Sequence, residues 1–219
     1  MKKLILLLIL ISICERTVTA QTSQTTVTTN EKGEKITEVK IFPLDKTERR
    51  ESKILYRGSI LFNESFEMAT FKPKDAKAFD AAVLFNLYKE ELVTKVEDKE
   101  VLLSKMDFSI RGQNFITHEG HYYELLFENE DVKILKKYNC ILKSNRGHGG
   151  VSLGGVYEGD FIRNESYFLL PTDEKMKEFT LNKSSVFSML EKRNDLLAQP
   201  INRNTLQITK IEDVIALLR

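Results

Sequence analysis

Ser152 stands at the centre of a literal G-x-S-x-G pattern, formed by residues 150–154. In hydrolases this pattern makes a strained turn between a strand and a helix and presents the serine as a nucleophile. Here residues 143–149 are not strand-like, and residues 155–161 have the pattern of a strand where a helix is required. The context therefore favours a glycine-rich loop at residues 145–155, and a hydrolase that uses Ser152 is kept as an alternative.

Two of the three histidines lie close enough in sequence to suggest a metal site. His118 and His121 are separated by Glu119 and Gly120, a gap one residue shorter than the H-E-x-x-H spacing that puts two imidazoles on one face of a helix. Zinc also requires a third protein ligand. With Gly120 between them, both imidazoles are expected at an exposed hairpin turn, and a metal site at His118 and His121 is a further alternative.

The third histidine, His148, lies in the glycine-rich loop, and no histidine follows Ser152. The chain order of serine, acid and histidine that this hydrolase class uses therefore cannot be completed, although other orders occur on other folds. The loop also lacks the patterns of nucleotide-binding loops. We assign no catalytic, cofactor-binding or metal-binding residue, expect no cofactor, and lean toward a protein that is not an enzyme.

Residues 1–20 have the pattern of a secretory signal peptide. Two lysines precede an apolar run over residues 4–13, and the segment ends in small residues at Ala20. Cys14 could mark a lipidation site, but lipidation needs a small residue before the cysteine, and an isoleucine stands there. At about 1.5 Å per residue the apolar run spans roughly half of a bilayer core, so we expect no transmembrane segment in the mature chain. We predict cleavage between Ala20 and Gln21, and an exported protein that is periplasmic or extracellular, in preference to a lipid anchor at Cys14.

Charge and cysteine content exclude two classes of protein. The chain has 33 basic and 32 acidic side chains, and both signs mix within windows such as residues 89–100. A nucleic-acid partner is excluded because it would require a basic surface. Cleavage after residue 20 leaves one cysteine, Cys140, so no intramolecular disulfide can form. Cys140 alternates with apolar residues, which predicts a buried, unreactive thiol.

Hydrophobic periodicity gives the elements that would position these residues. Residues 21–30 are rich in threonine, and we expect residues 21–50 to form a flexible leader, with a strand near residues 36–42, before Pro43, as an alternative. Residues 51–219 are expected to form one domain. Apolar and polar residues alternate over residues 54–142 in short runs between turn signals, which predicts an antiparallel β-meander with a half-closed or barrel-like sheet. From about residue 183 the period becomes helical, so the fold class is α+β, mainly β, with a short C-terminal helical segment.

Two segments, residues 84–96 and residues 120–138, resemble a broad group of uncharacterised secreted proteins of Bacteroidetes. In that group a strand with a tyrosine-asparagine pair precedes a hairpin with paired tyrosines and paired lysines. The similarity covers about residues 54–219, although Phe85 stands where relatives tend to have tyrosine and Pro200 interrupts an expected helix. The resemblance implies an exported β-rich domain with a helical tail and brings no catalytic residues.

The leading hypothesis is a non-catalytic binding or envelope-associated domain whose partner is another protein or an envelope component. The alternative is a carrier that holds an apolar ligand in a curved antiparallel sheet. The carrier requires a cavity lined by five phenylalanines: Phe62, Phe66, Phe85, Phe108 and Phe127. A cavity between sheet and helices would favour the carrier, and an interior filled by these side chains would argue against it.

Overall fold

The computed structural model describes residues 23–41, 52–74, 76–97, 99–144 and 157–218. The strands are β1 (Ser23–Thr29), β2 (Lys35–Ile41), β3 (Ser52–Arg57), β4 (Glu67–Lys72), β5 (Phe79–Asn86), β6 (Glu91–Val96), β7 (Lys99–Leu102), β8 (Asp107–Ile110), β9 (Gln113–His118), β10 (His121–Glu128), β11 (Val132–Ser144), β12 (Gly159–Pro171) and β13 (Lys177–Phe179). The helices are α2 (Lys183–Leu190), a 3-10 turn (Asn194–Leu196) and α3 (Ile211–Ile215). The signal peptide and the glycine-rich loop, with His148 and Ser152, lie outside the described residues.

The predicted fold class is confirmed: the protein is mainly β, with one large, mostly antiparallel sheet that is not closed and a short helical segment at its C-terminal end. The strand order is β1-β2-β3-β12-β11-β10-β9-β8-β4-β5-β6-β7, and β13 pairs with β12. Most neighbours follow one another in sequence, as a meander requires. The exceptions are β4 beside β8 and a short parallel contact of β3 with β12, in which Tyr56 lies opposite Gly159.

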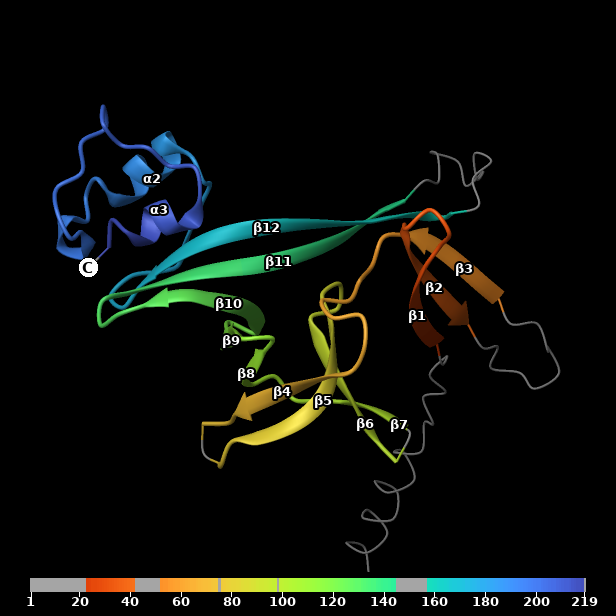
Figure 1. Ribbon diagram of the computed structural model, residues 1–219. Helices are drawn as coiled ribbons and strands as arrows, with labels where there is room; N and C mark the ends of the chain where they lie inside the picture. The colour runs from red at the N-terminus through yellow and green to blue at the C-terminus, as the bar shows by residue number, and fades with distance from the viewer. Residues whose placement is uncertain (1–22, 42–51, 75, 98, 145–156, 219) are drawn as a thin grey trace, which may run out of the picture.

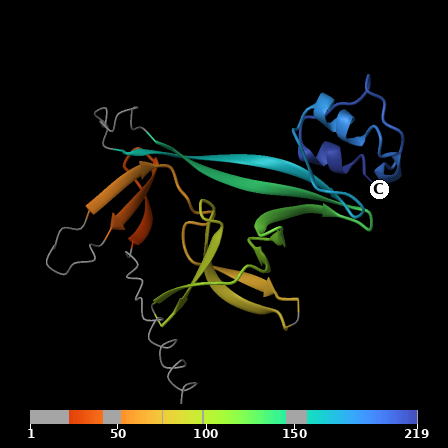
Figure 2. The ribbon, with the colours of Figure 1, turned by 180° about the vertical axis from the view of Figure 1, so that it is seen from behind.

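Strands β11 and β12 form a long two-stranded ribbon, in which all thirteen residues of each strand are paired. Figure 1 shows the hairpin strands β1–β3 at one end of this ribbon and the helical tail at the other, with β4–β9 on one side between them. Figure 2 shows the same arrangement from behind. No helix in the described ranges is long and apolar enough to cross a membrane.

Turn residues set the hairpins, as their sequence predicts. The β8–β9 turn has positive φ at Arg111 and Gly112, and the β9–β10 turn has positive φ at Glu119 and Gly120. Two consecutive left-handed residues characterise the tight turn whose twist matches that of an antiparallel pair. The strands on either side are therefore held in a fixed register.

The expected flexible leader is wrong for residues 23–41, which form the β1–β2 hairpin that pairs with β3. Threonine and valine favour extended backbone because their side chains branch at Cβ. The hairpin is also anchored from inside: Ile36 and Thr37 are buried, and the Thr37 hydroxyl donates to the carbonyl oxygen of Gly58 at 2.7 Å. The threonines of this segment are therefore better explained by their preference for strand structure.

The apolar residues form two separate cores along the ribbon. The first lies among β4–β10 and is built on five aromatic rings: Phe71, Phe85, Phe108, Phe115 and Tyr122. The second lies between the other end of the ribbon and the tail, where Ile134 and Leu169 meet Val186, Leu190 and Val214. The first core supports the strands that carry the candidate site.

One arginine ties the tail to the strands. The buried Arg193 guanidinium contacts Asp195 at 2.8 Å within the tail, and Asp173 and Glu174 at 3.1 and 2.9 Å in the turn after β12. Hydrogen bonds that Arg193 donates to Asp195 outweigh the effect of burial and raise the pKa of Arg193 above its ordinary value. The tail is thus attached by charge as well as by its apolar face.

Candidate functional site

The two histidines of the alternative metal site, His118 and His121, lie on either side of the β9–β10 turn and are paired with each other across it. His121 Nδ1 lies 2.8 Å from a carboxylate oxygen of Glu90, whereas the His118 ring packs against Tyr123 at 6.3 Å between centroids. Within the described ranges, no three histidine, cysteine, aspartate or glutamate side chains are grouped to hold a metal ion. The hairpin turn is as predicted, and the imidazoles have different neighbours.

Glu90 is the centre of a cluster of charged groups that sequence reasoning missed. Its carboxylate contacts Lys137 Nζ at 2.9 Å as well as His121, and Lys105 Nζ lies at 4.0 Å. Burial alone would raise the pKa of Glu90, but hydrogen bonds from Lys137 and His121 outweigh it and hold the pKa below its ordinary value of 4.5. Because the cluster joins the β5–β6 turn to β10 and β11, its role is to fix the position of that turn.

We expect Glu90→Gln to lower the free energy of unfolding at neutral pH by about 1 kcal/mol, because the amide cannot pair with Lys137. A carboxyl whose pKa is lowered by folding contributes stability above its unfolded pKa and loses that contribution as pH falls through the folded value. The deficit of the variant should therefore shrink on acidification from pH 7 to about 3. Urea unfolding at both pH values measures it; an equal deficit at both would contradict the assignment.

The five phenylalanines expected to line a ligand cavity do not share one. Phe85 packs against Phe62 and Phe108, with ring centroids 5.9 and 5.6 Å apart. Phe66 lies under the Lys95 ammonium at 4.8 Å, and Phe127 packs in the second core. Phe85 and Phe108 thus fill the interior with side chains, which does not support a carrier of an apolar ligand. Cys140 is buried, as predicted, and burial raises its pKa.

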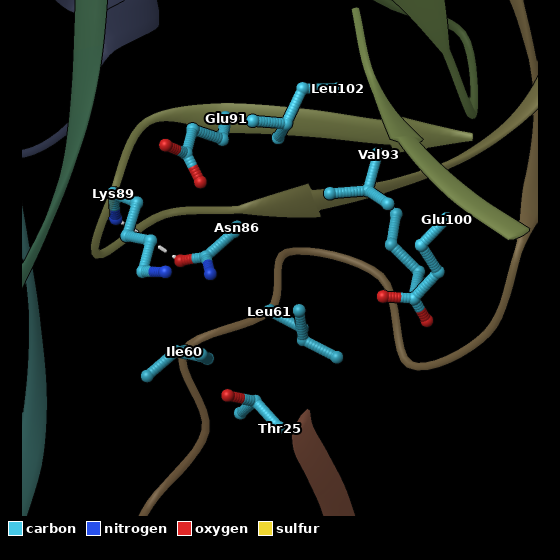
Figure 3. Close-up of a pocket in the computed structure, with 10 residues that line it drawn as sticks. Thr25, Ile60, Leu61, Asn86, Lys89, Glu91, Val93, Glu100 and Leu102 are labelled. Carbon is cyan, nitrogen blue, oxygen red and sulfur yellow. Dashed lines mark hydrogen bonds between the residues drawn. The ribbon is translucent and has the colours of Figure 1, made fainter. Parts of the chain in front are cut away.

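A groove on the outer face of β5–β7 is the site that we select (Figure 3). Register pairs Leu84 of β5 with Val93 of β6, and Val93 with Leu102 of β7, so these three side chains form an apolar row on one face of the sheet. Leu102 at the end of the row is 61% exposed. The row borders a pocket of about 260 Å³ that also receives Thr25 from β1.

Charged and polar groups lie on both sides of the apolar row, along the direction of the strands. Lys89, Glu91 and Asn86 lie on one side and Glu100 on the other, with Leu61 between them (Figure 3). Asn86 Oδ1 accepts a hydrogen bond from the Lys89 main-chain N–H at 3.1 Å. Neither Glu91 nor Glu100 forms an ion pair with any other residue in the ranges that the structure describes. The groove therefore combines exposed apolar surface with two carboxylates that form no ion pair in the part of the chain that the structure describes.

The floor of the groove is held by a buried asparagine, Asn63, whose role no pattern in the sequence indicates. Asn63 Nδ2 donates to the carbonyl oxygen of Val83 at 2.6 Å, and its Oδ1 accepts from the Phe85 N–H at 2.9 Å. Leu61 forms an isolated bridge with Asn86 beside it. Strand β4 pairs with β5 only as far as Val83, and beyond that residue these bonds take the place of a neighbouring strand. They position Leu61 beneath the apolar row.

A second and larger pocket, of about 530 Å³, lies between Phe62, Tyr138 and two arginines. Arg163 donates from Nε to the carbonyl oxygen of Ser59 at 2.9 Å and from Nη2 to that of Leu61, while Arg111 pairs with Glu67 through two nitrogens. The two hydrogen bonds from Arg163 fix the backbone at Ser59 and Leu61, which forms the groove floor. The pocket is therefore better explained as structural support.

Comparisons of the chain with protein-family models, with curated proteins and with solved structures find no match. The resemblance to secreted proteins of Bacteroidetes stays a prediction. Fold and groove together describe an open, mainly β protein with a small groove lined by apolar and charged side chains.

Proposed function

We propose that the protein is exported and acts as a non-catalytic binding protein, and that the groove of β5–β7 receives part of another protein or envelope component. The observation that carries this proposal is the apolar row of Leu84, Val93 and Leu102 between two carboxylates, Glu91 and Glu100, that form no ion pair within the described residues. Exposed apolar side chains next to unpaired charges are characteristic of surfaces that a partner covers.

The size of the groove favours side chains of a polypeptide over a lipid or another small ligand. Its volume of about 260 Å³ lies just below the range of roughly 300–1,000 Å³ typical of sites that enclose small molecules. It is also open, so that a ligand in it stays partly in solvent. One or two apolar side chains of a partner fit this space, and a basic side chain at either end would pair with Glu91 or Glu100.

The test of partner binding uses the exported chain as bait for proteins of the cell envelope. Three baits are compared: the unchanged chain; Val93→Lys, which places a cation in the apolar row; and Ile141→Lys, at a position 51% exposed on the ribbon and outside the groove. We expect at least one protein to be retained by the unchanged chain and by Ile141→Lys and to be lost with Val93→Lys. Equal retention by all three baits would contradict the proposal.

Export is tested separately by the mass of the protein recovered from outside the cytoplasm. Support for export comes from the signal pattern of residues 1–20. We expect the mass of a chain that begins at Gln21. A mass that includes an acyl chain on Cys14 would establish the lipid anchor instead, and a chain that retains Met1 in the cytoplasm would overturn export.

A further inference from the structure

The two ends of the open sheet border the same groove. The strand order begins at β1 and ends at β7, and within the described ranges neither has a second neighbour. Thr25 of β1 lines the pocket together with Glu100 and Leu102 of β7 (Figure 3). A strand added to β7 would therefore lie along the groove, next to β1.

The hydrogen-bond pattern of β7 shows which of its main-chain groups point outward. The Leu103 N–H donates to the carbonyl oxygen of Leu92 at 2.9 Å, so these two residues form a hydrogen-bonded pair. Such pairs alternate with non-hydrogen-bonded ones along an antiparallel ladder. Leu102 and Glu100 thus occupy non-hydrogen-bonded positions opposite Val93 and Lys95, and their N–H and C=O groups face away from β6.

The same two residues put their side chains on the groove face. Leu102 ends the apolar row, and Glu100 supplies an unpaired carboxylate two positions earlier. Residues of an added antiparallel strand that lie opposite them would put their own side chains on this face. An apolar side chain would extend the row from Leu102, and a basic one would pair with Glu100.

We propose, resting on the binding function above, that an extended segment of a partner protein adds to the free edge of β7 and that this segment has a basic side chain two positions from an apolar one. All four residues of β7 are exposed, and none is a proline that would block the edge. Main-chain hydrogen bonds supply the affinity of such an added strand, and alternate side chains supply its specificity.

Charge complementarity selects a partner of this composition over a second copy of the same chain. If two β7 strands pair about Val101, Glu100 lies opposite Leu102; if they pair about Glu100, two carboxylates face each other. Strand β1 offers no cation either, because its sequence is Ser-Gln-Thr-Thr-Val-Thr-Thr. Within the chain Lys95 lies opposite Glu100 on β6. Neither of these self-pairings brings a cation of the second copy to Glu100 on the free side of β7, whereas a basic partner segment supplies one.

The proposal is tested with a blocked, fluorescent peptide in which valine and lysine alternate along one face and threonine fills the other. We expect saturable binding to the full exported chain, measured by fluorescence anisotropy. Glu100→Lys should weaken binding by about fivefold to tenfold and should instead bind a peptide with glutamate in place of lysine. A peptide N-methylated on its hydrogen-bonding edge should not bind. Absence of saturable binding, or equal binding of the N-methylated peptide, overturns the proposal.

Backbone and side-chain contributions are separated at Leu102. Leu102→Pro removes an N–H that faces outward and leaves the ladder to β6 intact, because proline is tolerated at such edge positions. It should weaken peptide binding by more than about tenfold, and more than Leu102→Ala, which keeps the N–H. Equal effects of the two variants overturn strand addition. If Val93→Lys loses the envelope partner while Leu102→Pro retains it, the groove binds a protein without strand addition; if neither loses it, the binding function itself fails.

Discussion

Phe108→Ala is expected to lower the free energy of unfolding by about 4 kcal/mol. The Phe108 ring is 1% exposed and stacks on Phe115 with centroids 4.8 Å apart. It also meets Phe85 and Tyr122 edge to face at 5.6 and 5.4 Å. Truncation removes apolar area and leaves a cavity that rigid neighbouring rings cannot fill, which places the cost toward the upper end of the usual range.

Urea unfolding followed by circular dichroism measures this loss, and Phe79→Ala is the matched control. Phe79 stacks on Phe71 at 5.0 Å but is 41% exposed, so its loss should cost about 1 kcal/mol. If Phe108→Ala lowers the free energy of unfolding no more than the control does, the aromatic cluster is not a tightly packed core. Such a result would also reopen the ligand carrier, because a loosely packed interior could admit an apolar molecule.

Gly58→Ala is expected to cost about 3 kcal/mol, the second largest effect. Gly58 has a φ of +89°, a conformation that residues with a Cβ rarely adopt. A Cβ at this position would also clash with the carbonyl oxygen of Phe161. The backbone must therefore move where β3 meets β12, and the β1–β3 strands are attached to the ribbon through that contact.

Gly33→Ala separates the cost of the positive φ from the cost of the clash with Phe161. Gly33 has a φ of +78°, but no atom lies within 4 Å of the added Cβ. It carries the conformational penalty alone, about 1 kcal/mol. Thermal unfolding of both variants measures the difference. Equal shifts would show that close approach to Phe161 does not matter, and that the β3–β12 junction can relax.

Much of the fold could be predicted from alternation and turn residues, because both act locally. Leu92 and Thr94 face the core, as their alternation indicates, and Glu119 and Gly120 make the turn that their types favour. For residues 23–41, the amino-acid composition led to a wrong prediction of the structure. Their threonines looked typical of a flexible segment, but pairing with β3 and the burial of Ile36 and Thr37 hold them in a hairpin.

The groove could not be predicted, because it depends on distant pairings. Leu84, Val93 and Leu102 become neighbours only through the register of three strands. Thr25 and Leu61 approach them from other parts of the chain, and the bonds of Asn63 that place Leu61 are set by tertiary structure. Short motifs such as the His118 and His121 pair were visible in the sequence, yet tertiary contacts gave these imidazoles different neighbours.

The length of the β11–β12 ribbon sets the distance between the two ends of the molecule. With thirteen paired residues per strand at about 3.3 Å each, it is roughly 40 Å long. Strands β5–β7 lie on one side of it and the helical tail at its end (Figure 1). Removing two residues from each strand would shorten the ribbon by about 7 Å without turning any side chain to the other face. The distance between the β1–β3 strands, which join the ribbon at Gly159 and Asp160, and the helical tail is therefore set by strand length.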